Sequence, residues 1–174
     1  MKNVAKVFTG FLYLAIALAV CYPAWAAEVD IELFAPARQA ARAIQAARRA
    51  KAPELAPDDM RLADLYNEDA VAALKPPSGP SDVEKAARLF RLAGAQARVA
   101  ETRAIEIVRE REAAAAGNQY MDAINWDPQR ILPPRPPRAQ AAAEYHQRQR
   151  EAAEARAAHR TAEAELHKLL DQPR

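Results

Sequence analysis

Hydrophobic positions recur along this chain with the spacing of amphipathic helices. Over residues 36–51, alanines and one isoleucine repeat at intervals of three and four, and arginines lie towards the other side. Residues 58–75 repeat the pattern with leucines, a tyrosine and alanines. A third and longer stretch covers residues 81–116. Together these stretches predict an all-α protein.

Prolines and small residues mark where these helices should begin and end. Pro36 suits the first position of a helix, where its missing N–H is not needed. Pro53 and Pro57 remove two backbone donors and predict a break in the first arm of the fold. The Pro-Pro-Ser-Gly-Pro run at 76–80 predicts a turn.

The third helix carries the most specific signals. Ser81 and Glu84 have the spacing of a capping box, which predicts a helix that begins at Ser81. Gly117 and Asn118 predict its end. Two sets of residues repeat every seven positions and predict a lengthwise seam of mostly small side chains. They are Ala86, Ala93, Ala100 and Ile107, and Phe90, Ala97 and Ala104.

Two arrangements satisfy this pattern. The first two helices together are nearly as long as the third, so a broken arm lying antiparallel to an unbroken one would give a long helical hairpin. An elongated three-helix bundle is the alternative. Because alanine buries little area, either arrangement must be stabilised by many small contacts along a long interface.

The C-terminal third has a different character. Residues 118–138 form a Pro-rich linker without periodicity, and the run 133–138 predicts a semi-rigid polyproline II spacer. Residues 139–174 are rich in Ala, Glu, Arg and Gln and predict a charged, mostly solvated helix. The expected organisation is therefore a segment 1–26, a helical hairpin or bundle over 27–117, the linker and this last helix.

Leu166, Leu169 and Leu170 form the one substantial apolar patch of the last helix. We expect this patch either to contact a partner or to pack weakly on the hairpin. Trp126 and Tyr120 lie in an aromatic-poor region and are expected to pin the linker back onto a helix, with ligand or partner docking as the alternative.

The first 26 residues have the order of a secretory signal peptide. Basic residues precede an apolar run, and the small residues Ala24 and Ala26 flank Trp25, so cleavage is expected between Ala26 and Ala27. The apolar run is shorter than the roughly 20 residues that comfortably span a bilayer. Cys21 follows a bulky valine, which disfavours a lipoprotein site. Export to the periplasm or cell envelope follows, with membrane contact only before cleavage.

Charge and cysteine content narrow the classes of function. The chain has 25 basic and 23 acidic side chains, and cleavage removes two lysines, so the processed chain is formally neutral. Neutrality gives no electrostatic reason to expect a nucleic-acid partner. Cleavage also removes the single cysteine, which leaves no thiol chemistry and no disulfide.

Catalytic and metal-binding patterns are lacking in the sequence. The two serines lie in the turn and at the expected cap, far along the chain from the histidines. His146, His159 and His167 do not have the spacing of three or four that ligands on one helix need. The glycines are isolated, whereas a phosphate loop needs closely spaced glycines. We therefore expect no enzyme activity, no cofactor and no metal.

The runs 40–47, 52–55 and 89–101, which read AARAIQAA, APEL and LFRLAGAQARVAE, resemble a family of short Ala-rich helical envelope domains of unknown function. Such domains occur on lipoproteins of Gram-negative bacteria. The resemblance covers about residues 34–115 and implies a location and a shape, but no site residues. Nothing after Gly117 resembles the peptidoglycan-binding domain that follows in some relatives.

The leading hypothesis from the sequence is therefore a non-catalytic periplasmic or cell-envelope protein that binds other envelope proteins through its helix faces or tail. The alternative keeps the N-terminal segment uncleaved and makes the chain a membrane-tethered adaptor.

Overall fold

The computed structural model describes residues 24–75, 79–125 and 138–172, with side chains from Ala35 onward. The described residues form helices and no strands, which confirms the all-α prediction. Their bounds are α2 (Ala24–Arg49), α3 (Ala52–Leu55), α4 (Pro57–Ala73), α5 (Pro80–Ile124) and α6 (Arg138–Leu170).

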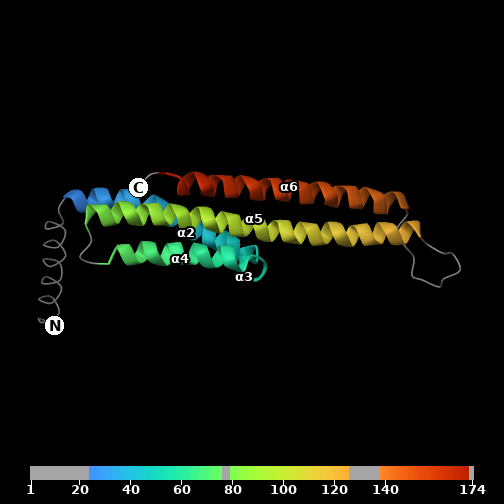
Figure 1. Ribbon diagram of the computed structural model, residues 1–174, viewed down its shortest axis with the longest axis horizontal. Helices are drawn as coiled ribbons and strands as arrows, with labels where there is room; N and C mark the ends of the chain where they lie inside the picture. Colours follow the sequence, from blue (N-terminus) through green and yellow to red (C-terminus); the bar gives the residue numbers. More distant parts are fainter. Residues whose placement is uncertain (1–23, 76–78, 126–137, 173–174) are drawn as a thin grey trace, which may run out of the picture.

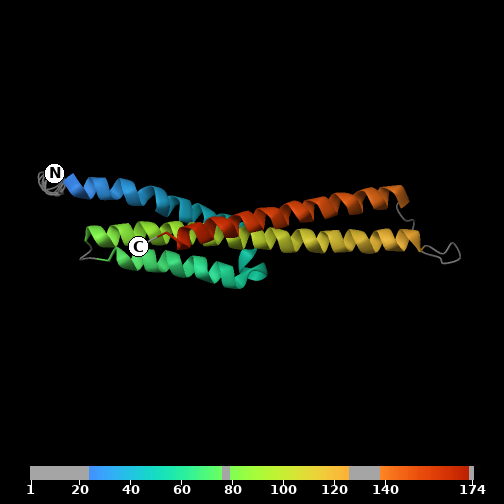
Figure 2. The same cartoon turned by 45° about the horizontal axis from the view of Figure 1, so that its top comes forward.

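Helix α5 is the central element of the molecule. Helices α2 and α4 both pack on its N-terminal half, and α6 runs antiparallel along it from the far end (Figures 1 and 2). Beyond the end of α2 and α4, the molecule continues as a two-helix arm made of α5 and α6 alone. The fold is therefore a three-helix bundle that shares its longest helix with a helical hairpin.

The chain reverses direction between α2 and α4, where the sequence predicts a break. Lys51 adopts a left-handed backbone with φ of 62°, and Ala56 leaves the helical region with φ of −136°. Between them α3 is a single turn that ends before Pro57. The helical hairpin, in which both segments would form one broken arm, is thus wrong, and the three-helix alternative is correct for this part. A left-handed residue and two prolines together turn the chain back.

The first helix does not begin at Pro36. Helix α2 starts at Ala24, and Pro36 lies inside it with its ring buried. Proline removes one internal hydrogen bond, but the residues before it are rich in alanine and glutamate, which favour a helix. Burial of the proline ring offsets part of the cost, so the helix continues on both sides.

The predicted seam of small residues is confirmed. The alanines at 86, 93, 97, 100 and 104 are fully buried, and Phe90 is nearly so. Their neighbours across the seam include Ala40 and Ala47 of α2 and Met60 and Ala63 of α4. At Gly94 the two backbones come close, because a Cβ there would lie 3.4 Å from the Ala40 Cα. Small side chains let three helices pack at short range.

Both predicted ends of the long helix are wrong. Gly79 is the N-cap, and the Asp82 carboxylate accepts a hydrogen bond of 2.8 Å from its N–H, so Ser81 lies inside the first turn. At the other end α5 passes through Gly117 and stops at Ile124. The residues assigned to the linker before 125 are therefore helical, and 126–137, with most of the proline run, lie outside the described residues.

Candidate interaction surfaces

The leucine patch of α6 packs mainly within the chain. Leu166 is 9% exposed and lies with Ala162 against an apolar cluster on α5. Leu169 packs at the edge of the cluster, whereas Leu170 is 43% exposed. The α5 members are Leu92, Ala95 and Val99. Of the three predicted contact residues, Leu170 therefore offers the most surface to a partner, and their partner role stays a prediction.

Charged side chains connect α5 and α6 further along. The Arg109 Nη1 atom donates to Glu112 Oε2 at 2.8 Å and to Glu151 Oε2 at 3.1 Å. Arg148 Nη1 donates to the same two oxygens, at 3.3 Å and 3.1 Å. Two arginines and two glutamates thus form a closed network across the interface. Such networks contribute more to the stability of the folded state than isolated surface ion pairs do.

The network changes the proton affinities of two of its members. The Gln147 amide donates a hydrogen bond to Glu151, and this bond, with those from Arg148, lowers the pKa of the Glu151 carboxyl. The hydrogen bond from Arg109 to Glu112, and the charge of that carboxylate, raise the pKa of Arg109. Glu151 and Arg109 therefore stay charged at neutral pH, which keeps α6 paired with α5.

Two further contacts hold the far end of the arm closed. Arg138, the first residue of α6, donates from Nε to the Ala123 carbonyl at 3.0 Å and from Nη2 to the Ile124 carbonyl at 3.1 Å. A guanidinium on the last carbonyls of α5 serves as a C-cap. Nearby, the rings of Tyr120 and Tyr145 stack with centroids 5.7 Å apart.

Gly117 has a packing role at this end. A Cβ there would lie 3.2 Å from the Tyr145 ring, so the glycine gives the ring room. Tyr120, which the sequence analysis assigned to the linker, packs on α6 instead, whereas Trp126 lies outside the described residues. The sequence does not predict the contact between Gly117 and Tyr145, because the contact depends on how α6 folds back along α5.

Buried polar groups in the core are paired. Gln96 of α5 donates from Nε2 to Asp59 Oδ1 of α4 at 3.0 Å. Arg103 donates to the buried Glu106 at 2.7 Å, and this hydrogen bond and charge raise the pKa of Arg103. The Gln96–Asp59 hydrogen bond joins α4 to α5, whereas the Arg103–Glu106 pair lies within α5. In the part of the chain that the structure describes, every buried side-chain polar atom has a hydrogen-bond partner.

Ser81 and the contact of His159 lie at different places along α5 in the described part of the chain. His159 lies in the α5–α6 interface, with its Nδ1 3.3 Å from Thr102 Oγ1 and its Nε2 3.4 Å from Glu163. Ser81 lies in the first turn of α5, and Ser78 is outside the described residues. Within the described ranges, no three His, Cys, Asp or Glu side chains are placed to hold a metal ion.

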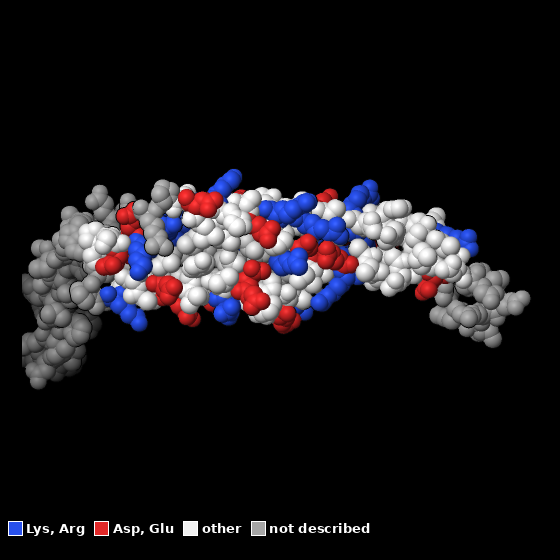
Figure 3. Space-filling model, viewed as in Figure 1, with Lys and Arg blue, Asp and Glu red and all other residues white. Residues whose placement is uncertain are grey.

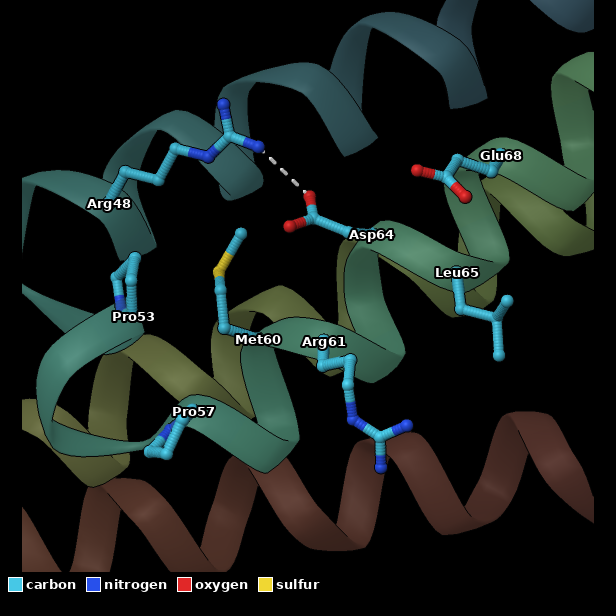
Figure 4. A pocket seen from close by; sticks show the side chains of 8 residues that line it. All are labelled: Arg48, Pro53, Pro57, Met60, Arg61, Asp64, Leu65 and Glu68. Carbon is cyan, nitrogen blue, oxygen red and sulfur yellow. Dashed lines mark hydrogen bonds and ion pairs between the residues drawn. The ribbon is translucent and has the colours of Figure 1, made fainter.

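An open depression of about 500 Å³ lies beside the reversal (Figure 4). Buried Met60 is part of its lining, and Arg48 and Asp64 pair across it at 3.1 Å. The lining residues are Arg48, Pro53, Pro57, Met60, Arg61, Asp64, Leu65 and Glu68. This lining has two carboxylates, Asp64 and Glu68, and no hydroxyl, thiol or histidine.

Among the described helices, none covers the face of α5 opposite α6 in the arm. The heptad position that is buried at Ala86, Ala93 and Ala100 continues to Ala114 and Met121, which are exposed. Figure 3 shows charged side chains gathered over the middle of the molecule, with a mainly uncharged surface towards the end of the arm. This open face is the most extended candidate for binding.

The three residues at the predicted cleavage site lie in the first turn of α2, with side chains outside those described. None of the described helices is both long enough and apolar enough to cross a bilayer. Cleavage after Ala26 stays a prediction.

No family model matches the chain, and no curated protein or solved structure matches it either. The resemblance to Ala-rich envelope domains therefore stays a prediction.

Proposed function

We propose that this chain is a non-catalytic interaction protein of the bacterial cell envelope, which binds other proteins through the faces of its helical arm. The observation that carries the proposal is the open face of α5. Met121 at one edge of this face is 53% exposed, and Val108 at the opposite edge is 38% exposed. Apolar side chains exposed along one helix face are typical of surfaces that bind another helix.

The location rests on the N-terminal sequence. A basic start, an apolar run and the small residues Ala24 and Ala26 support export and processing. Mass spectrometry of the N-terminus of the expressed protein tests this part. A chain that begins at Ala27 supports a released envelope protein, and a chain that begins at Met1 supports the membrane-tethered adaptor.

Affinity capture from envelope extracts tests binding. The full chain should retain one or more envelope proteins, and a variant with Val108→Asp and Met121→Asp should lose them, because carboxylates on the open face oppose apolar docking. A matched control places the same two changes at Ala153 and Ala157, exposed residues of α6. Equal capture by all three proteins would contradict a binding role for this face.

A further inference from the structure

Two charged side chains of α4, Arg61 and Glu68, line the depression beside the reversal, and both are exposed. Within the described part of the chain, neither of them has a hydrogen bond or an ion pair. Their spacing along the helix corresponds to ~10 Å, and Figure 4 shows their charged ends apart from each other. The depression therefore presents a cation and an anion at a separation that the helix sets.

Apolar side chains line the same depression. Met60 is buried, Leu65 is 46% exposed, and Pro53 and Pro57 lie at the end near the reversal. The volume of about 500 Å³ falls within the range of sites for small ligands. A ligand that fits this lining carries an apolar group between two charged ends.

The ion pair across the depression offers polar groups to the middle of such a ligand. Arg48 Nη2 and Asp64 Oδ1 are joined by a contact of 3.1 Å. This contact leaves further guanidinium donors and the second carboxylate oxygen to bond a ligand. A peptide group has one carbonyl acceptor and one N–H donor, which match these two partners.

We propose that the depression binds a short peptide with free termini. Its carboxylate pairs with Arg61, its ammonium pairs with Glu68, and an apolar side chain packs on Met60 and Leu65. An extended chain spans ~3.3 Å per residue, so about three residues match a separation of ~10 Å, whereas a single amino acid is too short. The site lies on α4 and does not use the open face of α5, so it goes beyond the proposed binding of envelope proteins.

Titration of the full chain with the tripeptide Ala-Leu-Ala tests the site. Both ion pairs are exposed to solvent, so the dissociation constant should be on the order of 1 mM. NMR of isotope-labelled methionine methyl groups follows the depression directly, because Met60 belongs to its lining. The Met60 signal should shift during the titration. Met121 on the arm is the internal control, and its signal should stay in place.

Charge removal from the protein and from the peptide assigns the two ends. Arg61→Gln and Glu68→Gln should each weaken binding of the free tripeptide about threefold. The C-amidated peptide should not respond to Arg61→Gln, and the N-acetylated peptide should not respond to Glu68→Gln, because the matching charge is already absent. Arg42→Gln and Asp69→Asn remove exposed charges outside the lining and should leave binding unchanged.

A Met60 signal that does not move at about 10 mM tripeptide overturns the proposal. Equal binding of the free and the blocked peptides also overturns it, as does an equal loss in the control variants, because each result removes the role of the two charges. Capture of envelope proteins by the α5 face is measured separately, so each proposal is decided without the other.

Discussion

Lys51 carries the one left-handed backbone among the described non-glycine residues. Its carbonyl accepts hydrogen bonds from the Glu54 and Leu55 amides, which fixes the reversal between α2 and α4. A side chain at this position costs about 1 kcal/mol relative to glycine, because Cβ crowds the backbone. The three-helix bundle therefore tolerates local strain at its turn.

Lys51→Gly should raise the free energy of unfolding by up to about 1 kcal/mol, because glycine adopts a left-handed backbone without strain. Chemical denaturation monitored by circular dichroism measures the change. Lys51→Ala is the matched control, since it removes the charge but keeps Cβ, and it should leave stability nearly unchanged. Equal stabilisation by both variants would show that the charge, not the backbone, matters.

Gly94 lies at a close approach of α5 to α2, and a pair of variants tests the packing there. Gly94→Ala should be tolerated or stabilising by up to about 1 kcal/mol, since its Cβ meets Ala40 at ordinary contact distance and alanine favours helix. Gly94→Val should destabilise the protein, because a branched side chain overpacks the seam. Thermal unfolding compares the two. Equal melting temperatures for Val and Ala variants would contradict the close packing.

Some residue positions could be predicted from the sequence and others could not. The seam alanines follow from spacing alone, since a seven-residue repeat predicts one buried stripe. Gly117 was assigned to a helix end, whereas it lies under the Tyr145 ring. The local sequence cannot show whether a glycine ends a helix or makes room for a side chain of another helix. The prediction that Ser81 caps the helix is wrong because Gly79 and Asp82 form the cap two residues earlier along the chain.

At the scale of elements, α6 packs on α5 through an apolar cluster near its C-terminal end, through buried alanines and the Tyr145 ring further along, and through charged contacts. Leu166 packs with Leu92 and Val99 of α5, and the Arg109–Glu151 network lies further along the same interface. The sequence predicted this helix but left its docking open, because its alanines and charges give only a weak pattern. The position of α6 is therefore set by contacts along the whole of its interface with α5.

Leu166→Ala should lower the free energy of unfolding by roughly 2–3 kcal/mol, because it removes a buried side chain from the cluster. Leu170→Ala removes the same atoms from an exposed position and should cost less than about 0.5 kcal/mol. Denaturation measures both, and hydrogen exchange of α6 should quicken only in the first variant. Similar effects of the two changes would contradict this placement of α6.

The charged network makes the docking of α6 dependent on pH. Because its hydrogen bonds lower the pKa of Glu151, the carboxylate stabilises the folded state above its ordinary value of 4.5. That contribution is lost as the pH falls below 4.5 through the lowered value.

Glu151→Gln should therefore show a smaller loss of thermal stability on acidification than the unchanged chain. Melting temperatures measured from neutral pH down to about pH 3 give the comparison. Glu154→Gln, an exposed acid on the same helix, is the control and should follow the unchanged chain. If the melting temperature of the Glu151→Gln variant also falls with pH as that of the unchanged chain does, the network does not contribute to the pH dependence of stability.

At the scale of the whole molecule, the sequence predicted the fold class but not the path of the chain. Helical periodicity and proline positions located four of the helical stretches. The reversal at Lys51 and the extension of α5 to Ile124 were missed, because both depend on tertiary packing. The candidate binding face was missed for the same reason. Its residues are ordinary in sequence and are open only because α2 and α4 end beside Ala104.

The central claim is that α5 is one unbroken helix from which a two-helix arm extends beyond the bundle. Small-angle X-ray scattering of residues 27–174 at low concentration tests it most directly. A helix of 45 residues is ~67 Å long, so the radius of gyration should be about 20 Å or more. A radius of about 15 Å, the value for a compact chain of this size, would contradict an extended arm.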